Sequence, residues 1–138
     1  MQMGPESLRG GSPGSAGVID YRLARSALIT QYRKGRLAQH QVCDAHPELV
    51  RAAREIGMPT SRDCPICQDA QLVHVTYVFG PRLPSHGRCV TTAKEISQLN
   101  RRPEALAAYV VEVCPSCSWH HLVQTFPLGK PARKRAAR

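Results

Sequence analysis

The chain has 138 residues, of which 19 are lysine or arginine and 10 are aspartate or glutamate, so its formal net charge is +9 at pH 7. This length predicts one domain with a modest core, and the charge favours nucleic acid or an acidic protein surface as a partner. No apolar run approaches the roughly 20 residues of a membrane-spanning helix, and residues 1–17 lack the apolar centre of a secretory signal, so we expect a cytoplasmic protein with no membrane partner.

The two ends of the chain differ in composition from its centre. Residues 1–17 are rich in glycine, serine and proline, and we expect them to be disordered because they bury too little apolar surface to offset their ordering entropy. Residues 129–138 contain five basic residues and no acidic one, which predicts a basic disordered tail. Residues 18–128 are predicted to form a single domain, with a helical part at 18–58 and a zinc ribbon at 63–128.

Two amphipathic helices are predicted in the first half of this domain. The first spans about 20–34, where Asp20 is a suitable N-cap and Gly35 a suitable C-cap. Its expected buried stripe comprises Leu23, Ala27, Leu28 and Tyr32. The second spans about 46–56 and has Pro47 at its first position. Its expected buried residues are Leu49, Ala52, Ala53 and Ile56.

The second half of the domain has mainly the alternating pattern of strands. Residues 72–79 alternate in period two and are rich in β-branched and aromatic side chains, so they predict a strand, and shorter strands are predicted at 109–113 and 121–126. Thr92 and Glu95 match a capping box and predict a helix inserted between the strands. A polar connector and a loop are expected at 60–63 and 80–89.

Two cysteine pairs share one spacing, Cys64-Pro65-Ile66-Cys67 and Cys114-Pro115-Ser116-Cys117. Thiolates are soft donors, and four of them surround Zn²⁺ tetrahedrally, so the doubled C-x-x-C predicts a four-cysteine zinc site. Four protein ligands leave no position for a substrate, so this zinc is expected to be structural. A redox dithiol and a pair of disulfides are the alternatives, and a reducing compartment disfavours the disulfides. The predicted fold class is α+β: a small antiparallel zinc-ribbon sheet with an N-terminal helical pair and one inserted helix.

Other cysteine and histidine residues are candidates for chemistry. His120 and His121 directly follow the second cysteine pair, and either can be interpreted as a substitute ligand or a general base. We favour histidines that form hydrogen bonds beside the thiolates, because such donors are common around metals. Cys43 lies near His46, which suggests a Cys–His dyad, although free cysteine is more often a small buried hydrophobe. Cys89 is likewise interpreted as a small buried hydrophobe.

Basic residues cluster in the first predicted helix and in the tail. The candidates for contacts with nucleic acid or a partner are Arg22, Arg25, Arg33, Lys34, Arg36, Arg133, Lys134 and Arg135. Neutralising phosphates with these side chains would give salt-sensitive, mainly sequence-independent affinity. The alternative interpretation is a solvated helix face and a solubilising tail. Aromatic residues make up only 5% of the chain, so a base-stacking platform is not expected.

Several segments carry a family resemblance: VCDAHPEL at 42–49, CPIC at 64–67, VTYVFG at 75–80, VEVC at 111–114 and CSWHHLV at 117–123. They resemble a small actinobacterial family of unknown function that has relatives in mycobacteria and streptomycetes. The resemblance covers roughly residues 18–128, and the family usually has asparagine where His120 stands. It implies a cytoplasmic actinobacterial protein, and it implies no particular activity.

We therefore predict a non-enzymatic zinc-ribbon protein that binds nucleic acid or a nucleic-acid machine such as RNA polymerase or the ribosome, with no small-molecule substrate. The sequence has no phosphate-cradling glycine loop and no nucleophile elbow, which disfavours catalysis. One alternative is a protein–protein adaptor for an acidic partner. A less favoured alternative is a thiol redox sensor that uses a labile C-x-x-C pair.

Overall fold

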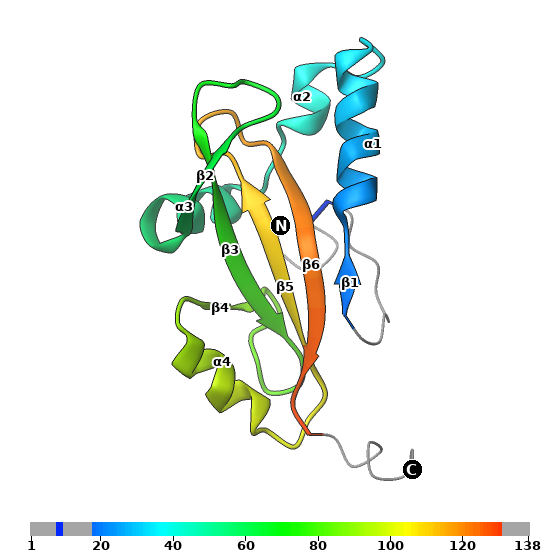
Figure 1. Ribbon diagram of the computed structural model, residues 1–138. Coiled ribbons are helices and arrows are strands. Elements are labelled where there is room, and N and C mark those ends of the chain that lie inside the picture. The colour runs from blue at the N-terminus through cyan, green and yellow to red at the C-terminus, as the bar shows by residue number, and fades with distance from the viewer. Residues whose placement is uncertain (1–7, 10–17, 131–138) are drawn as a thin grey trace.

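The computed structural model describes residues 8–9 and 18–130 and has the predicted α+β class (Figure 1). Within these residues, six strands form one antiparallel sheet and four helices lie around it. In chain order the elements are β1 (Ile19–Asp20), α1 (Arg22–Arg33), α2 (Gln39–Val42), α3 (Pro47–Ile56), β2 (Met58–Asp63), β3 (Gln71–Phe79), β4 (Arg88–Val90), α4 (Ala93–Asn100), β5 (Leu106–Val113) and β6 (His120–Leu128).

Three long strands form the centre of the sheet. The strand order is β1-β6-β5-β3-β2, and β4 also pairs with β3. In the central pairing of β3 with β5, Tyr77 lies opposite Tyr109 and Val73 lies opposite Val113. The predicted strands were confirmed at their centres, but β5 begins earlier than expected and β6 continues to Leu128. This pairing places the turn before β3 and the turn after β5 at the same end of the sheet, and α4 lies at the other end (Figure 1).

The first helix, α1, lies where it was predicted, but its buried side differs from the expected stripe. Leu23 is 87% exposed, so its expected burial was wrong, and Ile29 is the residue of α1 that is buried. Asp20 belongs to β1, and its Oδ1 accepts a hydrogen bond from the Arg22 N–H at 2.8 Å. The cause of the difference is tertiary: α1 packs along β6, and its residues Leu28, Ile29 and Tyr32 contact the cluster at the cysteine end of the sheet, so Leu23 is left facing away from the core.

Three helices, not the predicted pair, precede the long strands, because the single turn α2 lies between α1 and α3. Helix α3 was predicted correctly, with Pro47 in its first turn and the His46 Nδ1 accepting the Glu48 N–H at 3.1 Å. Its residues Leu49 and Ala53 are buried. The helix ends at Ile56, whose expected burial was wrong because this side chain is 49% exposed.

Two short strands were missed by the sequence prediction. β2 covers the expected polar connector, and β4 takes up the end of the expected loop. β2 is an edge strand with exposed residues on both faces, so it has no apolar alternation that could reveal it. It begins just after Gly57, where a Cβ atom would lie 2.1 Å from the Val73 Cγ1, and this close approach requires glycine.

The inserted helix α4 was confirmed together with its capping box. The Thr92 side chain accepts a hydrogen bond from the Glu95 N–H at 3.2 Å, and the Glu95 carboxylate accepts one from the Thr92 N–H at the same distance. Leu99 of this helix is buried beside Val78 and Leu106. Helix α4 therefore closes the end of the sheet that is remote from the cysteines.

The two faces of the sheet are covered by different helices. Val111 and Val113 of β5 pack with Leu49 of α3. Glu112 lies between these valines, and side chains alternate along a strand, so it points to the opposite face, where it meets Arg25 of α1. Helices α3 and α1 consequently lie on opposite faces.

The N-terminal segment contributes to the core at one point. Leu8 is 1% exposed and packs in the cluster beneath α3, and the backbone carbonyl of Arg9 accepts the Leu122 N–H at 2.9 Å. The predicted disorder of residues 1–17 is therefore wrong at these two residues, while the rest of that segment lies outside the described residues. The tail prediction beyond Lys130 also lies outside them. None of the helices in the described ranges is both long and apolar enough to span a membrane.

Candidate metal centre

The four paired cysteines come from two turns that the sheet brings together. Cys64 and Cys67 lie between β2 and β3, and Cys114 and Cys117 lie between β5 and β6. Because β3 pairs with β5, the two turns are adjacent although they are far apart in sequence. The four Sγ atoms all lie within 4.8 Å of one another. The four predicted ligands thus form one cluster that can hold a metal ion.

The distances in this cluster fit a four-thiolate site. The Sγ atoms of Cys64 and Cys117 are 3.7 Å apart, and those of Cys67 and Cys114 are also 3.7 Å apart. Four sulfurs placed tetrahedrally at about 2.3 Å from a central ion would be about 3.8 Å from each other. Two of the six sulfur–sulfur distances therefore match the spacing that a shared ion requires, and the others lie within 4.8 Å.

The two cysteine turns are closed by the same backbone hydrogen bond, from the Gln68 N–H to the Cys64 carbonyl oxygen at 3.1 Å and from the Ser118 N–H to the Cys114 carbonyl oxygen at 3.0 Å. Backbone N–H groups also reach sulfur in both turns: the Cys64 Sγ accepts the Ile66 N–H at 3.4 Å, and the Cys114 Sγ accepts the Cys117 N–H at 3.3 Å. The residue after each pair has a positive φ, 59° at Gln68 and 75° at Ser118. These N–H groups stabilise negative charge on sulfur, so each turn is preorganised for thiolates.

Burial opposes negative charge on two of the four sulfurs, those of Cys64 and Cys117. The pKa of Cys67 is lowered: burial there acts in the opposite direction, but it is outweighed by hydrogen bonds to the sulfur, led by that from the Asp69 N–H. Cys64 and Cys114 are fully buried, and burial raises the pKa of the Cys64 thiol to about 11. Burial also raises the pKa of the Cys117 thiol. A cation that binds here must displace protons from thiols, so the buried sulfurs need a cation to become thiolates together.

An apolar shell with one buried ion pair surrounds the cysteines. Trp119 is fully buried and packs with Ile29 and the cysteine turns. Its Nε1 donates to the Glu112 Oε2 at 2.8 Å, and the Arg25 Nε donates to the same oxygen at 2.6 Å. Arg25 was predicted to contact nucleic acid or a partner, with a solvated helix face as the alternative, and in the structure its charge is paired with a buried carboxylate. The sequence signal that was overlooked is Glu112, an acid inside an apolar strand.

The two histidines after the second pair do not belong to the sulfur cluster. The His120 Nε2 lies 3.2 Å from the Asp44 Oδ1, and its Nδ1 accepts the Arg9 N–H at 3.4 Å. The His121 Nδ1 lies 2.8 Å from the Leu122 carbonyl oxygen, and its ring stacks on Trp119 with centroids 6.1 Å apart. Neither ring contributes to the group of metal-ligating atoms that the described residues form.

A fifth cysteine lies beside the cluster. The Cys43 Sγ is 3.3 Å from the Cys117 Sγ, to which its thiol donates. Burial raises the pKa of Cys43, so it remains a thiol at neutral pH. The suggested dyad with His46 has a different arrangement, since the His46 Nδ1 accepts the Glu48 N–H. Sequence reasoning missed this contact of Cys43, because nothing local relates it to the paired cysteines.

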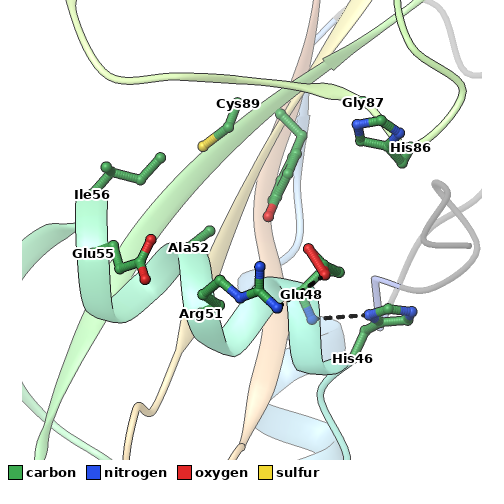
Figure 2. A pocket seen from close by; sticks show the side chains of 10 residues that line it. His46, Glu48, Arg51, Ala52, Glu55, Ile56, His86, Gly87 and Cys89 are labelled. Carbon is green, nitrogen blue, oxygen red and sulfur yellow. Dashed lines mark hydrogen bonds and ion pairs between the residues drawn. The ribbon is translucent and has the colours of Figure 1, made fainter.

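The sixth cysteine lines a separate hollow between α3 and β4, which has a volume of about 520 Å³ (Figure 2). Burial raises the pKa of Cys89 to about 11, which makes it a weak nucleophile at neutral pH. Two charged side chains of this hollow form an ion pair, with the Arg51 Nη2 3.6 Å from the Glu48 Oε1. The raised pKa of Cys89 does not indicate an activated nucleophile.

The other predicted basic residues have different surroundings. Arg22 is largely exposed, and its Nε lies 2.9 Å from the Asp20 Oδ2. Arg33 and Lys34 end α1 at the surface, and the Arg36 Nη1 donates to the Gln31 Oε1 at 3.4 Å. The three predicted tail residues, Arg133, Lys134 and Arg135, lie outside the described residues.

His120 predicts a pH dependence of stability. Its ring is buried, and burial followed by the nearby Arg9 charge lowers its pKa from 6.5 to about 4, although Asp44 acts in the opposite direction. The unfolded chain therefore binds a proton on this residue between those pH values while the folded protein does not. The contribution is fully present above pH 6.5 and is lost as the pH falls towards 4, by up to roughly 3 kcal/mol.

Urea unfolding of the intact protein and of His120→Asn at pH 7.5 and pH 4.5 measures this contribution. We expect the variant to lose less stability than the intact protein between the two pH values. Because both proteins keep the cysteines, proton competition at the metal site affects them alike. Equal losses in both proteins would contradict the prediction.

Comparison with known proteins agrees with the resemblance seen in the sequence. A family model described as a family of unknown function, DUF5318, matches residues 14–138. Two uncharacterized proteins, Rv0049 of Mycobacterium tuberculosis and Mb0050 of Mycobacterium bovis, are each 44% identical over 117 residues, which cover 83% of this chain and 85% of theirs. No solved structure shows significant similarity to this chain.

Proposed function

This chain belongs to DUF5318, a family of unknown function with mycobacterial members, and from its residues we propose that it is a non-enzymatic zinc-ribbon protein that binds nucleic acid. In this proposal the four paired cysteines hold one structural Zn²⁺. The metal holds the two cysteine turns together, and the basic surface of the helical part supplies the attraction to phosphate.

The choice of zinc rests on the ligand chemistry. Four thiolates at tetrahedral spacing suit Zn²⁺ or iron, and zinc is the usual ion of structural four-cysteine sites. Cys64, Cys67, Cys114 and Cys117 would occupy the whole coordination sphere, so no position is left for water or substrate. A zinc-bound protein is colourless, so visible absorption together with elemental analysis distinguishes the two metals.

The proposed binding function is carried by the charge of one segment. Residues 22–36 contain five basic residues and no acidic one, within a chain of net charge +9. Arg22, Arg33, Lys34 and Arg36 reach the surface. Such a concentration of charge on one helix and the turn after it suits a phosphate backbone, whose binding releases counterions.

Fluorescence anisotropy with a labelled single-stranded oligonucleotide tests this proposal. We expect binding that weakens as salt rises from 50 to 200 mM, with a logarithmic slope of about −0.7 per neutralised phosphate. The triple variant Arg33→Gln, Lys34→Gln, Arg36→Gln is expected to flatten that slope by about 2. The matched control carries Arg51→Gln, Lys94→Gln and Arg101→Gln, three exposed cations away from α1.

The outcome separates nucleic acid from an acidic protein partner. Absence of salt-dependent binding by the intact protein would overturn the proposal. Retention of an acidic protein by the immobilised chain after nuclease treatment, without affinity for the oligonucleotide, would favour the adaptor alternative instead.

A further inference from the structure

A second hollow lies between α1 and the edge strand β2, with a volume of about 500 Å³. Its floor is formed by β3, β5 and β6, and its walls come from segments that are far apart in sequence. The residues that line it include Arg22, Arg25, Ser26, Ser61, Arg62 and His74. Arg25 belongs to the ion pair beside the metal centre, whereas Arg22 and Arg62 are not accounted for by that centre.

The charges in this hollow do not cancel. Glu112 is 2% exposed and accepts hydrogen bonds from Arg25 and Trp119, so it neutralises Arg25 at the floor. Arg22 and Arg62 then contribute positive charge from opposite walls, one from α1 and one from β2. Asp20 lies near Arg22, but both side chains are more than half exposed, so water screens this pair.

Uncharged polar side chains also line this hollow. Thr60 uses its hydroxyl to bond the Leu72 carbonyl oxygen at 2.7 Å, and this contact holds β2 beside β3. The neighbouring Ser61 and Ser26 are exposed at the walls. Burial lowers the pKa of His74, so its ring is neutral at pH 7 and offers one N–H. Leu122 and Val123 add an apolar part to the lining.

We propose that this hollow, the α1–β2 cleft, binds one nucleotide unit of a single-stranded nucleic acid, with its phosphate between Arg22 and Arg62. The inference rests on the proposed nucleic-acid function and names where on the protein a strand is held. The volume suits one nucleotide, and a rigid duplex cannot enter a concave site of this size. Guanidinium groups pair well with phosphate oxygens, and the apolar lining suits a sugar or base.

Single substitutions on the full-length, metal-loaded protein test this site. Arg22→Gln and Arg62→Gln are each expected to weaken binding of a fluorescent single-stranded 12-mer roughly tenfold at 100 mM salt, because each removes a charge-assisted hydrogen bond to phosphate. Each is also expected to flatten the salt slope by about 0.7. Arg51→Gln on α3 is the matched control, since it removes one exposed arginine elsewhere and is expected to leave affinity unchanged.

Two further measurements make the outcome decisive. A nucleoside monophosphate is expected to compete with the 12-mer at millimolar concentration, and a duplex of the same sequence is expected to bind more weakly than the strand. If the intact protein binds the strand but Arg22→Gln and Arg62→Gln weaken binding no more than Arg51→Gln does, the cleft is excluded and the nucleic-acid proposal survives. If the intact protein does not bind the single-stranded 12-mer at all, both the cleft proposal and the nucleic-acid proposal are contradicted.

Discussion

Replacing Cys114 by serine is expected to abolish metal binding and the cooperative fold. Cys114 is fully buried, and its Sγ lies 3.7 Å from the Cys67 Sγ across the two turns. Structural zinc contributes about 10–16 kcal/mol in small zinc peptides, while a whole domain is stable by about 5–15 kcal/mol. The loss of one ligand therefore threatens the entire stability of the protein.

Elemental analysis and thermal unfolding measure this effect. We expect about one zinc per chain for the intact protein under the four-thiolate proposal, and less than a tenth of that for Cys114→Ser, with no sharp thermal transition. Cys89→Ser is the matched control because Cys89 lies in β4, away from the cluster, and Cys43→Ser tests the neighbouring thiol. Both controls are expected to keep the metal. A Cys114→Ser protein that still holds one zinc would contradict the four-cysteine site.

The ligand set was predictable because its determinants are local. Each C-x-x-C turn forms its own N–H···S bonds, as between Ile66 and Cys64, so the spacing alone indicates how the sulfurs point. The approach of the two turns depends on the pairing of β3 with β5, and both strands show clear apolar alternation or β-branched runs. The helix α4 was predictable for the same reason, since Thr92 and Glu95 cap it through contacts three residues apart.

The parts that could not be predicted depend on contacts between distant segments. Leu8 is one apolar residue among glycine, serine and proline, so no hydrophobic periodicity predicts that it joins the core. β2 is held as an edge strand by its pairing with β3, and its own residues, such as Pro59, disfavour a strand. The α1–β2 cleft exists only because these two segments lie on either side of the sheet floor, so no sequence window contains it.

Arg25 shows how helical periodicity can mislead. On an isolated helix it falls on the polar side, which suggested a solvated cation. In the folded chain the same side faces Glu112, whose neighbours Val111 and Val113 point into the opposite apolar face. An acid that must be buried by its strand needs a cation, and α1 supplies one.

Substituting Arg25 by methionine is expected to destabilise the protein by about 3–5 kcal/mol, because the change leaves the Glu112 carboxylate buried without its ionic partner. The Arg25 side chain is 19% exposed and that of Glu112 is 2% exposed, so water cannot replace the lost guanidinium well. Methionine keeps most of the aliphatic stem, so the effect reports the charge. Urea unfolding at pH 7 in excess zinc measures it, and Arg22→Met, at an exposed neighbour, is expected to stay within about 0.5 kcal/mol of the intact protein.

A double-mutant cycle separates the ion pair from packing. Glu112→Gln removes the buried charge and keeps an oxygen that can accept the Trp119 Nε1–H, so we expect it to cost less than Arg25→Met. The double variant is expected to be more stable than Arg25→Met alone, with a coupling energy of about 2 kcal/mol or more. If Arg25→Met costs no more than Arg22→Met, the carboxylate is reached by water and the buried ion pair does not organise this face of the sheet.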